Sequence, residues 1–362
     1  MAENKNMNNN YKKINLLQHI GTGVPNTEEA WKWYRKFFGL DIPMFDSVAD
    51  APLMNIYTNN NPVNKRATMV LNMQGGCAME IVELKSIKCK KPETEIMLGD
   101  YGIFITKIKV KNVQAAYKYF TENAGEVLSG IKKSPDNNDT FYVKDINGLI
   151  FQIVQDDASF SMSGHVSGGI TGCVIGVSNI EKSKKFYCDL LGFDKIIYDK
   201  TGVFEDWASV PGGLSETRRI LLSQSKGPLG AFSEFSGPAY IELVQVLDRT
   251  PKKIFQNRIW GDSGFIHLCF DVKGMAQIGE ECAQKGFPFT CDSKNVLNMG
   301  NHTEVHCTYI EDADGTLVEF TEVYKIPILK KIGWFLDVAK RNPEKPLPSW
   351  MLKGMRFSRV KD

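Results

Sequence analysis

Two strand-like segments in the last third of the chain decide the fold: Gly264-Phe-Ile-His-Leu-Cys-Phe-Asp-Val272 and Glu311-Asp-Ala-Asp-Gly-Thr-Leu-Val-Glu-Phe-Thr-Glu322. Each contains a short apolar run that alternates inward and outward, which is the pattern of a strand. The first segment carries His267 and the second carries Glu319. Both side chains are therefore expected to point from a strand into the interior. We interpret them as half of a metal site.

The chain contains an internal repeat. A strand pattern from Ile14 to Val24 is followed by a helix pattern, and the same order recurs from Ile170 onward. An Asn before each helix is a typical N-cap, and a Gly after it is a typical helix stop. Aligning the two copies gives these matched pairs: Asn26 with Asn179, Tyr34 with Tyr187, Gly39 with Gly192, and Asp41 with Asp194. Such a period should be found before any fold is assigned.

Two shorter copies complete the repeat. Strand patterns at 102–110 and 264–272 each precede a helix pattern and a glycine. Their closing segments also match, because the turn and strand at 145–152 align with those at 312–319. The longer copies close instead with the apolar segments 77–82 and 239–244. We therefore predict four units, each made of one strand, one helix and three further strands.

The remaining segments suggest boundaries between the units. A Ser/Gly-rich stretch has the composition of a linker, and the apolar residues from Ile328 to Ala339 recur at helical spacing. The Asn-rich N-terminus is expected to be a flexible tail. The predicted divisions are a tail at 1–13, a first domain of two units at 14–157, a linker at 158–169, a second domain of two units at 170–324, and an amphipathic helix with a Pro-rich tail at 325–362.

Composition narrows the functional classes. The chain is 43% hydrophobic and 24% charged, which excludes a disordered or fibrous protein. The formal net charge is +2, and the charged residues are interspersed, so no basic face for nucleic acid is evident. We therefore expect a small-molecule partner. The protein is expected to be a monomer or a homodimer. The eight cysteines lack any C-x-x-C pair and are expected to be reduced thiols. With no apolar run long enough to span a bilayer, we predict a cytoplasmic protein with no membrane partner.

The four units, the helix ending Phe-Tyr-x-x-x-Leu-Gly-Phe, the Asp-x-x-Gly turn and the strand histidine together resemble the vicinal oxygen chelate superfamily. This superfamily includes glyoxalase I, the bleomycin resistance proteins and the extradiol dioxygenases. The resemblance implies an α+β fold in which four βαβββ units pair into two curled mixed-sheet half-barrels, here with a C-terminal helical extension. It also implies metal ligands on the first and last strands of each unit.

Reading those positions onto this chain gives the pairs His19 and Glu80, Ile105 and Gln152, Gly172 and Glu242, and His267 and Glu319, in unit order. If neighbouring units pair in order, neither pair of units holds a satisfactory ligand set. If the first unit pairs with the fourth, as in the large single-chain glyoxalases, His19, Glu80, His267 and Glu319 form one complete site. The second and third units then share a site that has lost its metal. This division into one intact site and one relic is the more economical, and it is the pairing that we predict. A set of two imidazoles and two carboxylates suits one divalent ion such as Zn, Ni, Fe, Mn or Co.

The resemblance and the ligand types together suggest a reaction class. A cation in a dry pocket stabilises negative charge on a substrate oxygen, so an enolate or enediolate can form near neutral pH. We predict a metal-dependent isomerase, epimerase or lyase in which Glu319 acts as the base, with Glu80 as the second catalytic carboxylate. An Fe(II) extradiol-type dioxygenase and a non-catalytic small-molecule binding protein remain alternatives. Trp207, Arg218 and Arg219 are expected to be structural, because Arg66 stands at a similar strand entry in the first unit.

Overall fold

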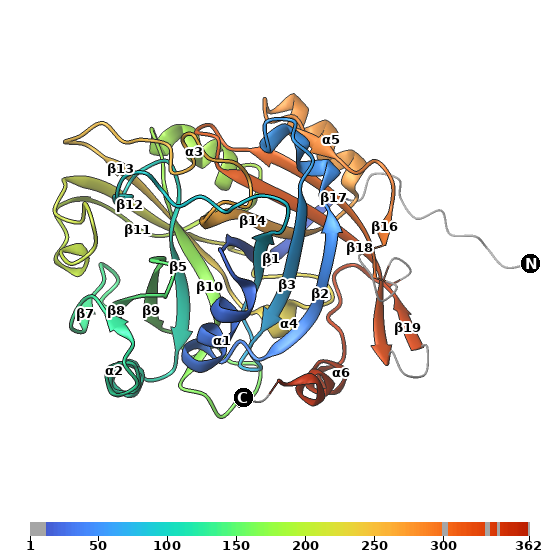
Figure 1. Ribbon diagram of the computed structural model, residues 1–362, viewed down its shortest axis with the longest axis horizontal. Helices are drawn as coiled ribbons and strands as arrows, with labels where there is room; N and C mark the ends of the chain where they lie inside the picture. Colours follow the sequence, from blue (N-terminus) through green and yellow to red (C-terminus); the bar gives the residue numbers. More distant parts are fainter. Residues whose placement is uncertain (1–11, 299–302, 330–333, 339–340, 361–362) are drawn as a thin grey trace, which may run out of the picture.

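The structure is a computed structural model that describes residues 12–298, 303–329, 334–338 and 341–360. In these residues all four predicted units are present, and their strands form two curled mixed sheets (Figure 1). The predicted α+β fold class is therefore confirmed. Apart from Lys12 and Lys13, the predicted N-terminal tail lies outside the described residues.

The first and third units have the same plan, with long second strands. The first comprises β1 (Lys13–Gly23), α1 (Thr27–Phe38), β2 (Ile42–Asp50), the 3₁₀ turn η1 (Pro52–Tyr57), β3 (Asn64–Leu71) and β4 (Ala78–Leu84). The third comprises β10 (Ser167–Gly176), α3 (Ile180–Tyr187), β11 (Lys195–Gly202), η2 (Glu205–Trp207), β12 (Thr217–Ser223), the short helix α4 (Ser233–Ser236) and β13 (Tyr240–Val246).

In the second and fourth units, two short strands replace the second strand. The second unit comprises β5 (Gly102–Val110), α2 (Val113–Glu122), β6 (Glu126–Val127), β7 (Lys132–Lys133), β8 (Asp139–Lys144) and β9 (Ile150–Gln155). The fourth comprises β14 (Gly264–Lys273), α5 (Met275–Gln284), β15 (Cys291–Asp292), β16 (Leu297–Asn298), β17 (Glu304–Glu311) and β18 (Leu317–Leu329).

Helix α1 begins and ends where its sequence predicts. The Asn26 side chain accepts hydrogen bonds from the backbone N–H groups of Glu28 and Glu29, which satisfies two donors that the helix itself leaves free. At the other end Gly39 takes the left-handed conformation, with φ of 59°. Asn179 caps α3 in the same way, so the repeated asparagines have a common structural role.

Each sheet takes one unit from each half of the chain. The first sheet runs β15-β17-β18-β14-β1-β4-β3-β2, so the first and fourth units share it. The second runs β11-β12-β13-β10-β5-β9-β8-β6, so the second and third units share it. In each sheet the two first strands meet side by side and antiparallel, as β1 with β14 and β5 with β10. The sequence halves 14–157 and 170–324 therefore do not each form one sheet.

The helical layer, in contrast, follows the sequence halves. Between α1 and α2 the rings of Phe37 and Phe120 lie 5.0 Å apart. The Tyr34 hydroxyl donates a 2.7 Å hydrogen bond to Asp145, which also accepts backbone N–H groups of its own turn. The matching residues of the second half repeat this contact, with 2.8 Å from Tyr187 to Asp312. The repeat thus keeps a buried tyrosine that ties one unit's helix to the next unit's turn.

The C-terminal extension differs from the prediction. No helix forms in the described part of 328–339: β18 continues to Leu329, and β19 (Trp334–Asp337) pairs with it. Ile332 and Ala339, two of the apolar residues of the predicted helix, lie outside the described residues. The open edge of β18 offers a hydrogen-bonding partner to an apolar segment that fits either period, and such tertiary pairing overrides a short helical pattern. Helical structure follows only at α6 (Ser349–Lys353) and the 3₁₀ turn η4 (Gly354–Ser358).

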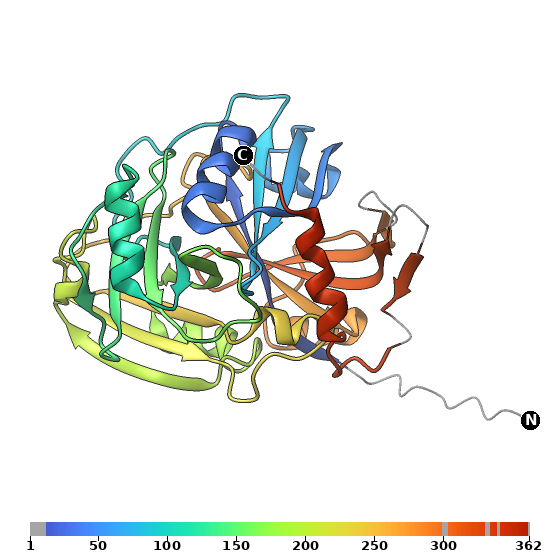
Figure 2. The same cartoon turned by 90° about the horizontal axis from the view of Figure 1, so that it is seen from below.

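This extension docks on the first sheet of the protein itself. Leu347 and Leu352 pack in one apolar cluster with Ile42, Leu71 and Ala78, which belong to strands of the first unit. In Figure 2 the C-terminal helix lies between the strands of the first unit and those of the fourth. The extension therefore covers part of the concave face that holds the site described below.

Two expectations from composition can be compared with the structure. All eight cysteines are free, and five of them are buried, namely Cys77, Cys173, Cys269, Cys282 and Cys307. Among the described residues no helix has the length and apolar character needed to cross a membrane.

Candidate metal centre

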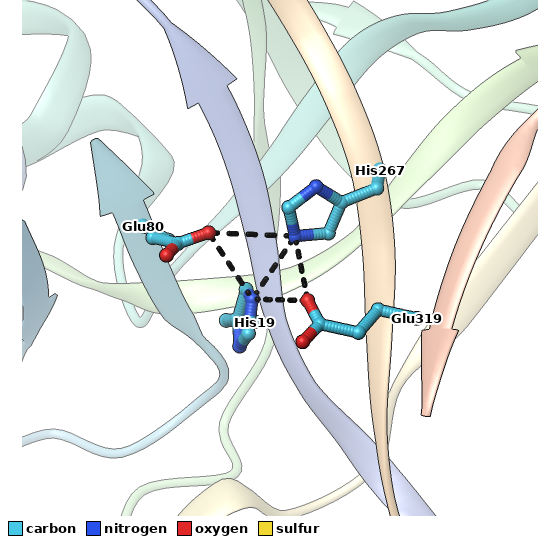
Figure 3. A group of neighbouring side chains, drawn as sticks. All are labelled: His19, Glu80, His267 and Glu319. Atoms are coloured by element: carbon cyan, nitrogen blue, oxygen red, sulfur yellow. Dashed lines mark hydrogen bonds and ion pairs between the residues drawn. The ribbon is translucent and has the colours of Figure 1, made fainter. Parts of the chain in front are cut away.

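Four neighbouring strands carry the four predicted ligands onto the concave face of the first sheet. His19 stands on β1, Glu80 on β4, His267 on β14 and Glu319 on β18, which are adjacent in the order β18-β14-β1-β4. In the parallel ladders Glu80 pairs with the residue two beyond His19, and Glu319 pairs with the residue two beyond His267. The two strand pairs thus present equivalent His and Glu side chains, and all four converge (Figure 3).

The nitrogen and oxygen atoms at the centre are close enough to share one ion. The Nε2 atoms of His19 and His267 are 3.1 Å apart, and Glu319 Oε2 lies 3.5 and 3.1 Å from them. Glu80 Oε2 lies 3.7 and 3.5 Å from the same two nitrogens. Ligand atoms at about 2.1 Å from a common ion are about 3.0 Å apart at right angles and about 3.4 Å apart in a tetrahedron. The spacing in this protein therefore fits a single transition-metal ion.

Local contacts decide which nitrogen of His19 faces the centre. Its Nδ1 lies 3.0 Å from Gln18 Oε1, which accepts the ring proton when that proton is on Nδ1. The Nε2 of the neutral ring then presents a lone pair toward the oxygens of Glu80 and Glu319. A cluster of electron-rich atoms in a buried place is unfavourable unless a cation or proton lies among them. This chemistry also fits a bound metal.

His267 is positioned by packing rather than by hydrogen bonding. Its ring lies directly over Gly21, where any Cβ would stand 2.2 Å from His267 Cε1. On another side the ring meets Tyr309 edge to face, with centroids 5.6 Å apart. Its Nδ1 has no hydrogen-bond partner among the described residues. Gly21 is therefore required by the site, and a glycine inside a strand is a recognised sign of such a close approach.

The four side chains of the centre, His19, Glu80, His267 and Glu319, are all buried. Burial raises the pKa of Glu319, but hydrogen bonds and charge from His19 and His267, when these rings are protonated, hold that pKa well below its ordinary value.

Three contacts around the centre were not foreseen from the sequence. Lys65 Nζ lies 3.6 Å from the outer oxygen, Oε1, of Glu80. The Thr321 hydroxyl donates a 3.2 Å hydrogen bond to Oε1 of Glu319. Gln18 orients His19 as described above. Strand alternation places Thr321 on the same face as Glu319, so it could have been named, whereas Lys65 depends on how β3 pairs with β4.

The second sheet has no ligand set at the equivalent place. The ladder pairs Gln152 with Lys107 and Glu242 with Val174, which puts Ile105 and Gly172 at the histidine positions. No side chain fits at Gly172, because its Cβ would stand 1.8 Å from the carbonyl oxygen of Tyr240. The predicted absence of a histidine ligand there thus has a steric reason.

Buried ion pairs occupy the centre of the second sheet instead. Glu242 accepts hydrogen bonds from Lys107 at 2.8 Å and from Arg219 at 2.6 Å. Arg219 also makes two 2.9 Å contacts to Asp206, and its guanidinium lies 3.4 Å from the ring centre of Trp207. Two cations therefore neutralise two carboxylates. We call Lys107, Asp206, Arg219 and Glu242 the ion-pair cluster.

Protonation of Glu242 is expected to destabilise the protein in acid. Burial would raise its pKa, but Arg219 and Lys107 lower the pKa to about 2. Because the folded-state pKa lies below the unfolded value near 4.5, this stabilisation is complete above about pH 4.5 and is lost as pH falls toward 2. The linkage amounts to about 3 kcal/mol at neutral pH, of which roughly half is gone near pH 3.

Urea unfolding of the wild type and the Glu242→Gln variant between pH 6 and pH 2.5 measures this loss. The free energy of unfolding of the variant should fall less steeply with acid than that of the wild type. Parallel pH profiles would show that Glu242 does not carry the acid sensitivity.

The other residues singled out in the sequence are structural or lie elsewhere. Arg66 pairs with Asp46 and Glu28, and Arg218 repeats this with Asp199 and Glu181, so the expected scaffold feature is present at both. Trp207 and Arg219 belong to the interior of the second sheet. His165 contacts the Lys36 carbonyl oxygen, His306 contacts Asp292, and His302 lies outside the described residues.

A comparison with protein families identifies the fold. The model of the Glyoxalase/Bleomycin resistance protein/Dioxygenase superfamily matches residues 169–320. These residues therefore resemble that superfamily in sequence. The resemblance inferred from the repeat is thereby confirmed. No curated protein matches the chain.

Solved structures extend the superfamily fold beyond residues 169–320. Glyoxalase I from Zea mays is 13% identical, with a TM-score of 0.53, over 86% of this chain and 92% of that chain. A proposed dioxygenase from Bacillus subtilis strain 168 is 12% identical, with a TM-score of 0.57, over 97% of this chain and 98% of that chain. At such identities the likeness concerns the fold alone, which both share with nearly all of this chain.

Proposed function

We propose that the protein is a divalent-metal-dependent isomerase, epimerase or lyase of the glyoxalase type. One observation carries this proposal: His19, Glu80, His267 and Glu319 bring their ligand atoms within 4.8 Å of one another in a buried place. These side chains come from both ends of the chain, and the two histidines are 248 positions apart. When both imidazoles are neutral, the lone pairs that they gather have no cationic partner among themselves. Structural demand alone would not assemble such a group, because an unpaired buried charge is costly.

The types of ligand atom limit which metal ions the site would bind. Two imidazoles and two carboxylates suit Zn, Ni, Fe, Mn or Co, whereas Mg and Ca prefer oxygen ligands alone. Cys269 and Cys307 lie nearby on the same face, but both thiols contact Thr321. A bound ion would act as a Lewis acid that stabilises negative charge developing on a substrate oxygen. Its identity is not part of the proposal.

In this proposal the chain itself moves the proton. Glu319 is the candidate base for a proton next to a substrate carbonyl, and Glu80 is the second carboxylate at the centre. Burial of both groups excludes bulk water, which strengthens their electrostatic effect on a developing enolate. His19 is held by Gln18 and His267 by Gly21, so neither imidazole needs to reorganise during the reaction. The substrate class is thus a small molecule with a proton next to a carbonyl group.

Metal content and proton exchange test the proposal together. Protein purified without chelator should contain one transition-metal ion per chain, since the ion-pair cluster leaves the second sheet without a ligand set. A panel of 2-hydroxy and 2-oxo carbonyl compounds in D₂O, followed by NMR, should reveal exchange of the carbon-bound proton. Glu319→Gln should lose the exchange, and Glu304→Gln, which alters a half-exposed carboxylate on β17, should keep it.

Three results would count against this function. Absence of stoichiometric metal would reject it and favour a binding protein. Two ions per chain would reject the account of the second sheet. Iron together with oxygen consumption on catechols would replace the proposed reaction with that of an extradiol dioxygenase.

A further inference from the structure

Both carboxylates of the centre turn one oxygen toward the histidines, and their other oxygens meet different groups. Each turns Oε2 to the two imidazoles, at 3.5 and 3.7 Å for Glu80 and at 3.1 and 3.5 Å for Glu319. The outer oxygen of Glu80 meets an ammonium group, that of Lys65 at 3.6 Å. The outer oxygen of Glu319 meets a neutral hydroxyl, that of Thr321 at 3.2 Å. The outer oxygens of Glu80 and Glu319 therefore contact groups of different charge.

Lys65 is itself held in place. It stands on β3, next to the strand that carries Glu80, and its side chain is 18% exposed. Its ammonium lies 5.1 Å from the centre of the Trp260 ring, within the range of a cation–π contact. Trp260 is buried, and its backbone N–H donates to the Tyr57 carbonyl oxygen. A fixed aromatic face thus supports the cation on one side while Glu80 attracts it on the other.

Thr321 makes the corresponding contact with Glu319. Its hydroxyl is shared with two thiols, at 3.3 Å to Cys269 Sγ and 3.7 Å to Cys307 Sγ. A hydroxyl donor to a carboxylate is weaker than an ammonium that carries full charge. The outer oxygen of Glu319 is therefore contacted by a neutral group, whereas that of Glu80 is contacted by an ammonium.

We propose that Lys65 is a positioning residue that holds the outer oxygen of Glu80, so that Glu80 would bind the ion through Oε2 alone. This inference rests on the proposed function, since it concerns the same centre. It assigns different roles to two side chains that the repeat makes equivalent.

The charge of Lys65 and its positioning of Glu80 predict opposite effects of removing Lys65 on metal affinity. A positive group beside the centre repels a divalent cation, so its removal should tighten binding if charge were its only contribution. Loss of a group that orients a ligand typically weakens metal binding by about 10–100-fold. The sign of the change therefore separates the two roles.

Metal titration of three variants tests the inference. Zn(II) and Co(II) affinities would be measured by competition with a chromophoric chelator for the wild type, Lys65→Met, Lys65→Arg and Thr321→Val. We expect Lys65→Met to bind about 10-fold more weakly, and Lys65→Arg to recover most of that loss because it keeps charge and reach. Thr321→Val, the matched control at the other carboxylate, should change affinity less than about 3-fold.

The Co(II) absorption spectrum gives a second measurement that a purely structural role would not alter. If the outer oxygen of Glu80 is released in Lys65→Met, it can also bind the ion, and the visible bands should lose intensity as coordination rises. The spectrum of Thr321→Val should keep the wild-type form. Thermal unfolding of each metal-free variant verifies that it is folded.

The outcomes separate this inference from the function on which it rests. A wild type that binds no metal rejects both. A wild type that binds metal, with Lys65→Met binding equally or more tightly, rejects the role of Lys65 alone. If Lys65→Met fails to fold, Lys65→Arg decides: a wild-type affinity and spectrum support the inference, and a loss equal to or greater than 10-fold overturns it.

Discussion

The His267→Ala variant is expected to lose tight metal binding while the rest of the fold persists. In the proposed centre His267 would supply one of four ligand atoms, and its Nε2 lies 3.1 Å from Nε2 of His19 and 3.1 Å from Glu319 Oε2. Structural four-ligand zinc sites bind with about 10–16 kcal/mol. Loss of one ligand in four should therefore cost on the order of 3 kcal/mol, or about 100-fold in Kd. Competition titration with Zn(II) measures the difference directly.

A second histidine of the same sheet provides the control. His306 stands on β17, contacts Asp292 and takes no part in the centre. His306→Ala should keep the metal affinity of the wild type within about 3-fold, because it removes no ligand. The His267→Asn variant leaves less empty space over Gly21 than His267→Ala does. It therefore distinguishes loss of a ligand from loss of packing. Equal affinities for His267→Ala and the wild type would remove His267 from the ligand set.

The Arg219→Met variant is expected to lower the free energy of unfolding by about 3–5 kcal/mol, the usual cost of breaking a buried ion pair on one side. Arg219 is fully buried, with Glu242 at 2.6 Å and two contacts to Asp206 at 2.9 Å. Methionine keeps most of the side-chain volume against Trp207, so the main loss is the charge that neutralises two buried carboxylates. Urea unfolding at neutral pH measures the change.

The adjacent arginine is a matched control for this variant. Arg218 points to the other face of β12, where its side chain is 28% exposed and pairs with Asp199 and Glu181. Exposed ion pairs contribute about 0–1 kcal/mol, so Arg218→Met should be nearly neutral. Similar losses in both variants would show that the ion-pair cluster does not stabilise the fold beyond an ordinary surface contact.

Much of the fold could be predicted because it depends on local patterns. Asn26 and Asn179 cap helices, Gly39 ends one, and the turns at Asp145 and Asp312 feed the closing strands, as the repeat indicates. The C-terminal segment shows the limit of such reasoning. Its apolar residues fit a helical period, yet the described part pairs as strands because β18 offers an edge.

The candidate centre was predictable in its residues but not in its surroundings. The types and repeat positions of His19, Glu80, His267 and Glu319 are visible in the sequence. Thr321 is also on the face that strand alternation assigns to Glu319. Gln18 adjoins His19 at an irregularity in the pairing of β1 with β14, which alternation does not predict. Lys65 could not be predicted either, since its place beside Glu80 follows from the pairing of β3 with β4. The ion-pair cluster also cannot be predicted from the sequence, because its contacts depend on strand pairing. Arg219 reaches Glu242 from the neighbouring strand of the same unit, and Lys107 reaches it from the second unit.

The sequence by itself determined the four repeated units, their helix caps and turns, and the ligand types at equivalent strand positions. These follow from periodicity and residue chemistry, which act over a few residues. The ligand positions and the family resemblance also predicted that the first unit pairs with the fourth, and the structure confirms this pairing, which brings His19 and His267 together. Only the tertiary structure decided that Lys65 contacts Glu80 and that Thr321 contacts Glu319. Contacts between residues 248 positions apart depend on how whole units pack, and no local pattern encodes that packing.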